Sequence, residues 1–66
     1  MSIRDEFLKE VLAFLDAASI SPSLFGRKAV GDPSFITRLK RGADVTASTM
    51  DKARSYMTAN QHLTLL

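Results

Sequence analysis

Positively charged side chains gather in one short stretch of this 66-residue chain, and the chemistry open to them is the binding of an anionic partner. Five of the nine Lys and Arg residues lie within residues 26–42: Arg27, Lys28, Arg38, Lys40 and Arg41. Residues 21–42 carry a net charge of +4, whereas residues 1–20 carry −2. This distribution is typical of a protein that turns one cationic side toward phosphate groups. The alternative is a solvated basic face that has no partner.

Other kinds of chemistry have little support in the residue types. The chain has no cysteine, and its single histidine, His62, cannot supply the usual set of zinc ligands. One tyrosine, Tyr56, and scattered carboxylates form no nucleophile–base pair, and no glycine-rich phosphate loop is present. We therefore expect a protein that is not an enzyme and that has no cofactor, no metal ion and no small-molecule substrate. His62 is expected to be a surface or packing residue.

Length and composition predict a single folded domain over residues 1–66. A chain this short buries only about 60% of the surface that its unfolded form exposes, so we expect an oligomer to add stability. Its apolar residues (45%) and charged residues (24%) are ordinary for a globular domain. The apolar stretches are too short for a membrane span, and the acidic N-terminus does not resemble a secretory signal. A cytoplasmic location is therefore predicted.

Capping residues and apolar spacing predict the helices that must position the basic stretch. Ser2 is a suitable N-cap for a first helix that runs to about Ala18. Apolar residues at helical spacing form a stripe along it that we assign to the core: Ile3, Phe7, Leu8, Val11, Leu12, Phe14 and Leu15. Thr46 caps a last long helix in the same way. The inner face of that helix is expected at Met50, Ala53 and Met57.

Two short helices joined by a turn are predicted within the basic stretch itself. Ser21 caps the first of them, and Gly31 ends it because glycine readily adopts the left-handed conformation of a tight turn. Asp32 then caps the following helix, Pro33 takes its first position, and the helix continues to about Arg41. Ile36 and Leu39 are expected to face inward by their spacing, and Phe35 to pack into the core, with contact to a thymine methyl group as its alternative. The same spacing places a polar set on the other side of the helix: Ser34, Thr37, Arg38 and Arg41.

Roughly residues 20–58 resemble the helix-turn-helix of the lambda-repressor-like (Cro/C1, XRE-type) DNA-binding domains. Gly26 stands where that family has a small residue that lets two helices approach each other. The turn departs from the family pattern of glycine followed by an apolar residue, because here Val30 precedes Gly31. The resemblance implies an all-α fold, a small bundle of four to five helices with a helix-turn-helix over about residues 21–42.

The resemblance also implies which residues meet DNA. Positions that would face the groove are Asp32, Pro33, Ser34, Thr37, Arg38 and Arg41. Arg38 could pair with a guanine, while Ser34 and Thr37 could contact phosphates or base edges. Phosphate contacts are expected from Arg27, Lys28, Lys40 and Arg41. The expected DNA-binding residues are thus Arg27, Lys28, Ser34, Thr37, Arg38, Lys40 and Arg41. Each could instead be an ordinary polar residue of a helix surface.

The function predicted by these features is sequence-specific binding of double-stranded DNA by a transcriptional regulator, with the helix over about residues 32–41 in the major groove. We expect a cytoplasmic, nucleoid-associated homodimer formed through the apolar C-terminal segment from Tyr56 to Leu66. The alternative is a helical protein–protein interaction module that does not bind DNA and that presents an apolar groove or its C-terminal leucines to a larger partner.

Overall fold

A computed structural model describes residues 2–64 of the chain. Its elements are α1 (Ile3–Ala18), α2 (Pro22–Val30), α3 (Phe35–Lys40), α4 (Ala47–Ala59) and a short 3-10 helix, η1 (Gln61–Thr64). No strand occurs within residues 2–64. The predicted all-α class and the predicted number of helices are confirmed.

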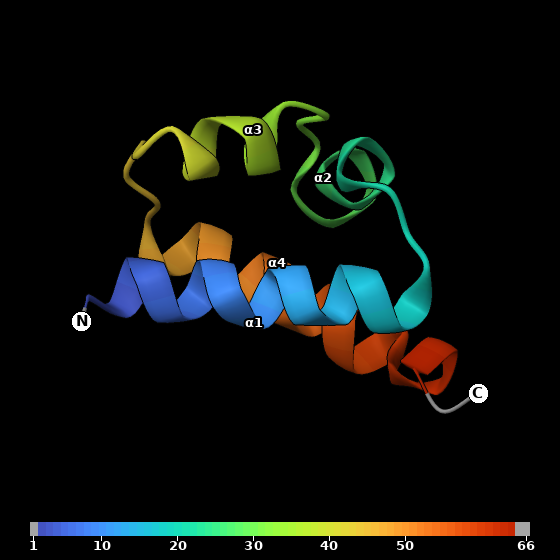
Figure 1. The fold of residues 1–66 in the computed structure, drawn as a ribbon. Coiled ribbons are helices and arrows are strands. Elements are labelled where there is room, and N and C mark those ends of the chain that lie inside the picture. The colour runs from blue at the N-terminus through green and yellow to red at the C-terminus, as the bar shows by residue number, and fades with distance from the viewer. Residues whose placement is uncertain (1, 65–66) are drawn as a thin grey trace.

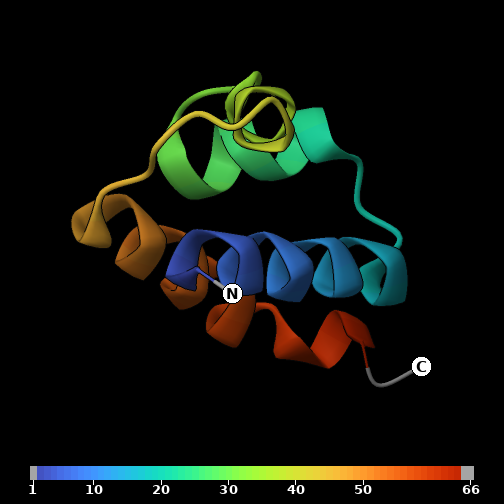
Figure 2. The same cartoon turned by 60° about the vertical axis from the view of Figure 1, so that its left-hand side comes forward.

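The helices form two layers. Figures 1 and 2 show α2 and α3 together on one side of the molecule and α1 and α4 on the other. Between the layers, α2 packs against α4 and α1 packs against α3, while α2 and α3 also pack against each other. The Cα atoms extend over 31 × 24 × 19 Å. Helix α3 therefore contacts both α1 and α2.

One apolar core lies between the layers, and all four α-helices contribute to it. Its buried members are Phe7, Val11, Leu15, Phe25, Phe35, Ile36, Leu39, Ala53 and Met57. Aromatic rings meet edge to face in it, with centroids 6.3 Å apart for Phe7 and Phe35 and 5.5 Å apart for Phe25 and Tyr56. Such geometry is favourable for aromatic quadrupoles beyond the burial of area. These contacts tie α1 to α3 and α2 to α4.

The core assignment of the α1 stripe holds at most positions and fails at one. Phe7, Val11 and Leu15 are buried as predicted. Ile3, which continues this row by one turn toward the N-terminus, is instead 69% exposed. The prediction for Ile3 was therefore wrong, because helical spacing specifies the side of a helix but not how far its neighbours cover it.

Three predicted N-caps are confirmed. The side-chain oxygens of Ser2, Ser21 and Thr46 each accept a hydrogen bond from the backbone N–H three residues later, at 3.1–3.2 Å. Each bond satisfies one of the donors that a helix start leaves without a partner. The predicted end of α2 is also confirmed, since Gly31 is its C-cap with φ of 76°. Local sequence therefore fixes where these helices begin and end.

The start of α3 differs from the prediction. Its N-cap is Ser34 and its first residue is Phe35, so Asp32 is not the cap and Pro33 is not in the helix. Asp32 Oδ1 instead accepts a hydrogen bond from the N–H of Ser34 at 2.9 Å, and its carbonyl accepts one from Phe35 at 3.1 Å. A short acidic side chain that bonds the backbone two residues later makes a turn. The helix is thus Phe35–Lys40, shorter than the expected 32–41.

The turn between α2 and α3 rests directly on Gly26. The N–H of Asp32 donates a hydrogen bond to the carbonyl of Gly26 at 3.0 Å. A Cβ atom on Gly26 would collide with the carbonyl oxygen of Asp32 and would press on Phe35 Cβ at 3.3 Å. Because the first of these neighbours is backbone, it cannot move aside as a side chain could. The close approach of the turn to α2 therefore requires glycine at this position.

We expect Gly26→Ala to lower the free energy of unfolding by about 2–3 kcal/mol, since the added methyl group overpacks a rigid contact. Ser23→Ala in the same helix, at an exposed position, serves as the control and should change it by less than about 0.5 kcal/mol. Urea unfolding followed by circular dichroism measures both. Equal stability of the two variants would contradict the role assigned to Gly26.

Candidate nucleic-acid interface

Helix α3 has one apolar face and one polar face. Phe35, Ile36 and Leu39 are buried, with 7%, 1% and 2% of their surface exposed. Successive helical residues turn by about 100°, which places a second set of residues on the opposite side. That set consists of Ser34, Thr37, Arg38 and Arg41, all of them exposed. The outer face of α3 predicted from the sequence therefore lies open on the surface.

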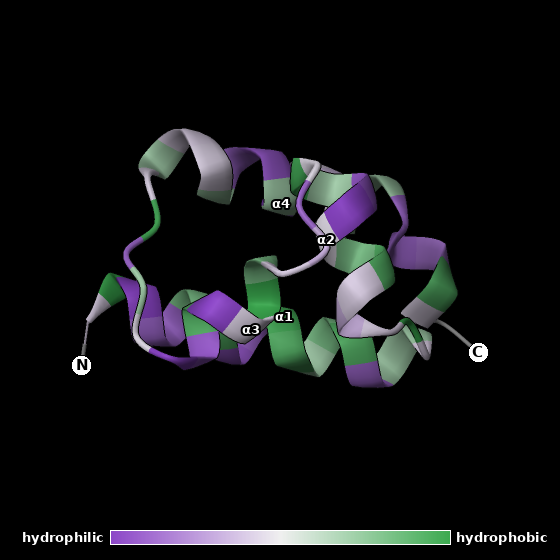
Figure 3. Ribbon diagram, turned by 90° about the horizontal axis from the view of Figure 1, so that it is seen from above, coloured by the Kyte–Doolittle hydropathy of each residue, from purple (hydrophilic) through white to green (hydrophobic). Residues whose placement is uncertain are grey.

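The remaining predicted cations flank this outer face. Arg27 and Lys28 lie in the last turn of α2, just before the turn that leads into α3, and both are exposed. Lys40 is exposed on the flank of α3. Seen from the side of α2 and α3, hydrophilic segments mark the last turns of both helices (Figure 3). All seven predicted residues are thus solvent-accessible on the layer formed by α2 and α3.

Asp32 has a different position from the one expected. It was predicted to face the groove, but it is half-buried, and its carboxylate is engaged on both oxygens. Oδ1 accepts the hydrogen bond from Ser34, and Oδ2 forms an ion pair with Nη2 of Arg38. Pro33 is exposed, as predicted. The carboxylate of Asp32 therefore belongs to the framework that holds α3 and Arg38.

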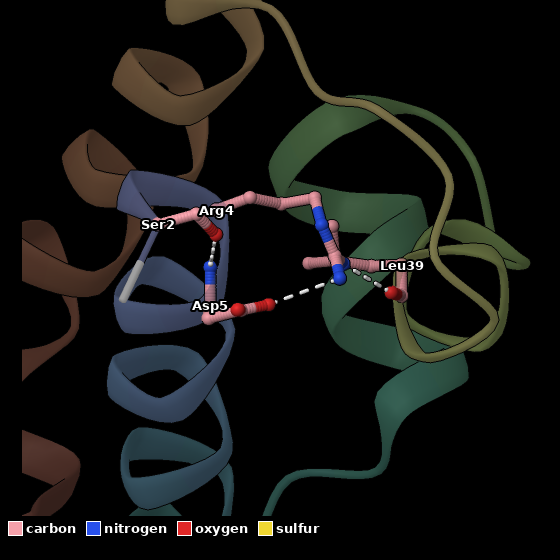
Figure 4. Close-up of polar contacts among 4 residues, drawn as sticks. All are labelled: Ser2, Arg4, Asp5 and Leu39. Carbon is pink, nitrogen blue, oxygen red and sulfur yellow. Dashed lines mark hydrogen bonds and ion pairs between the residues drawn. The ribbon is translucent and has the colours of Figure 1, made fainter.

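Arg4 holds the opposite end of α3. Its Nη1 donates a hydrogen bond to the carbonyl of Leu39 at 2.7 Å, and its Nη2 pairs with Asp5 Oδ1 at 3.0 Å (Figure 4). The last carbonyls of a helix lack partners within the helix and carry partial negative charge, so a guanidinium is well suited to this place, where the Leu39 carbonyl also accepts the N–H of Gly42 at 3.1 Å. Sequence reasoning missed this residue because 35 positions separate Arg4 from Leu39 and no local pattern links them.

A small open pocket of about 180 Å³ lies beside α3, at the connection to α4. It is lined by Phe35, Arg38, Leu39, Ala43, Asp44, Val45, Thr46 and Thr49. No group of three or more His, Cys, Asp or Glu side chains suited to a metal ion occurs in residues 2–64. Among the same residues, no helix combines the length and the apolar character needed to cross a membrane. The outer face of α3 with its flanking cations remains the most developed candidate site.

The predicted dimer surface is described only in part. Tyr56 is half-buried, and its ring packs edge to face on Phe25 in the core. Leu63 is half-buried in η1, which packs against α1 and α4. Leu65 and Leu66 lie outside the described residues. The Tyr56 ring thus packs against the core of its own chain, on the ring of Phe25.

We expect Arg4→Met to lower the free energy of unfolding by about 1–2 kcal/mol, because it removes a charged donor from a partly buried carbonyl while keeping an apolar stem. Lys9→Met is the matched control at an exposed position of α1 and should change it by less than about 0.5 kcal/mol. Thermal unfolding by calorimetry compares the variants. An Arg4 variant as stable as the Lys9 variant would show that the bond to Leu39 contributes nothing.

Comparison with known proteins adds no relative on which to base a function. No family model, no curated protein and no solved structure matches this chain. The features of the molecule that bear on function are the exposed outer face of α3, the cations that flank it, and the contacts that hold the two ends of this helix.

Proposed function

We propose that this protein binds double-stranded DNA sequence-specifically, with α3 in the major groove, and acts as a transcriptional regulator. The observation that carries the proposal is the division of α3 into a buried apolar face and an exposed face with Ser34, Thr37, Arg38 and Arg41. A helix is about 10–12 Å wide with its side chains, and the major groove is about 12 Å wide. Six helical residues rise about 9 Å, enough to follow roughly three base pairs.

The charge distribution supports the same partner. Residues 21–42 carry +4, and within them the cations lie at the ends of α2 and α3, on one layer of the molecule. Arg27, Lys28, Lys40 and Arg41 are assigned to the phosphates on either side of the groove. Such contacts position a protein on the duplex without reading its sequence. Arg38, near the middle of the outer face, is assigned to a base.

We infer further that α2, the turn and α3 form a helix-turn-helix of the lambda-repressor-like kind. Support comes from Gly26, where the absence of a side chain lets the turn lie on α2, and from α4, which packs against α2. In this arrangement the first helix braces the second, whose outer face enters the groove. A cytoplasmic, nucleoid-associated location belongs to this proposal.

The competing function, a protein–protein interaction module, needs an exposed apolar surface. Among residues 2–64, Ile3 is the one large apolar side chain that is exposed. A single exposed residue of this kind is normal for a folded domain. The described surface is therefore better suited to a polyanion than to an apolar partner.

DNA binding is tested by the salt dependence of the association constant, K, for a random-sequence duplex. We expect log K to fall linearly with log salt concentration, and Lys28→Gln to reduce the magnitude of the slope by about 0.9, because one phosphate contact is lost. Lys9→Gln, an exposed lysine on α1 opposite the buried row of that helix, removes the same charge and should leave the slope unchanged.

The double variant Arg38→Ala/Arg41→Ala tests whether the outer face of α3 binds DNA. If it binds every tested duplex as well as the parent chain does, or if the parent shows no salt-dependent affinity at all, the proposal is wrong. Salt-independent association with another protein would then favour the interaction module.

We also propose that the protein binds as a homodimer through its C-terminal segment. Helix-turn-helix dimers of this kind place their two groove-binding helices in successive major grooves, about 34–36 Å apart. Sedimentation velocity in the presence of a selected duplex should give two protomers per site, and the selected sequence should be a palindrome. A one-to-one complex on a non-repeated site would contradict the dimer.

A further inference from the structure

Asp32 is the one acidic residue within the basic stretch of residues 21–42, and its carboxylate is fixed in place. Its backbone is held on both sides, by the carbonyl of Gly26 at 3.0 Å and by the N–H of Phe35 at 3.1 Å. Its Oδ1 accepts a hydrogen bond from the N–H of Ser34 at 2.9 Å. Because Oδ1 alone completes the turn, the second carboxylate oxygen is available to act on a neighbouring side chain.

The other carboxylate oxygen of Asp32 binds Arg38. Oδ2 is shielded from solvent and forms the ion pair with Arg38 Nη2. The Arg38 side chain remains 62% exposed, and a guanidinium carries five N–H donors in a planar fork. One edge can therefore be bound by Asp32 while other donors stay available to a ligand. The contact restricts the orientation of Arg38 before any ligand arrives.

Arg38 differs in this respect from the other cations of the interface. Within residues 2–64, the ion pairs involve Arg4, Arg38 and Arg54. Neither Arg4 nor Arg54 belongs to the interface proposed above. Of the interface cations, Arg38 alone therefore carries a fixed negative charge at its side within the described residues. A phosphate that approached Arg38 would be repelled by Asp32, whereas the O6 and N7 acceptors of guanine are uncharged.

We propose that Asp32 is a specificity-determining residue, whose carboxylate orients Arg38 toward a guanine in the major groove and disfavours a phosphate at the same place. The inference rests on the proposed DNA-binding function and deepens it. Asp32 is a positioning residue, since it acts through Arg38. Its charge converts one arginine of a basic face from a general phosphate contact into a contact that depends on sequence.

The test compares Asp32→Asn with the parent chain. Asparagine keeps the side-chain oxygen that completes the turn but removes the charge. A duplex selected from random sequences and a scrambled duplex of equal length are the probes. The specificity ratio is the dissociation constant for the scrambled duplex divided by that for the selected duplex. We expect Asp32→Asn to lower this ratio about 5- to 150-fold, the range for one bidentate base contact. On the scrambled duplex, the salt slope should steepen by about 0.9, because Arg38 is free to take a phosphate.

Asp16→Asn is the matched control. Asp16 is exposed on α1, outside the layer that carries the interface, and the substitution changes the net charge by the same amount. Its specificity ratio should stay within about twofold of the parent ratio, since the general attraction to DNA affects both duplexes equally. If Asp32→Asn behaves like Asp16→Asn, Asp32 has no role in specificity, while the proposed DNA binding stands.

Arg38→Lys provides a second, independent variant that leaves the turn untouched. Lysine keeps the charge but lacks the planar fork, so the guanine preference should fall as far as in Asp32→Asn. Adding Asp32→Asn to Arg38→Lys should then lower the ratio no further, because the two residues act as one unit. An unchanged specificity ratio in Arg38→Lys would overturn the inference even if Asp32→Asn failed to fold. Where Asp32→Asn folds, additive losses in the double variant would overturn it as well. A parent chain that binds both duplexes equally, or neither, would refute the proposed function itself.

Discussion

The backbone of Asp32 lies on Gly26, and the position of α3 depends on that contact. A hydrogen bond at 3.0 Å joins the two residues, and the space for a Cβ on Gly26 is already occupied by the carbonyl of Asp32. Because the turn is pressed onto α2, Phe35 and Ile36 enter the core immediately after it. The burial of these side chains then leaves the opposite face of the helix open to solvent. One missing methyl group thus determines which side of α3 is available to a partner.

A helix of six residues does not persist on its own, because isolated helices shorter than about 12–15 residues are marginal in water. Helix α3 is stabilised from three directions. The turn at Asp32 fixes its start, its apolar face is buried against α1 and α2, and Arg4 binds the carbonyl of Leu39 near its end. A short helix held in this way is a rigid platform, and rigidity lowers the ordering cost of binding a partner.

Local chemistry made part of this structure predictable, and long-range contacts limited the rest. Caps such as Ser21 and Thr46 act within three residues, so the sequence contains all the information that they use. The start of α3 could not be fixed in the same way, because an aspartate before a proline can cap a helix or close a turn, and the contact with Gly26 favours the turn. The outer face of α3 followed from helical spacing. The role of Arg4 did not, since it is defined only once α1 and α3 have come together.

Arg4 binds a main-chain oxygen at Leu39 and touches none of the outward side chains of α3 through hydrogen bonds within the described residues. Every amino acid offers the same carbonyl, so this anchor is indifferent to which residues occupy the outer face. Positions 37 and 41 can therefore diverge in evolution, or be randomised in a library, while the scaffold keeps its geometry. The residues that maintain the architecture are thus separate from the exposed residues that can vary without disturbing it.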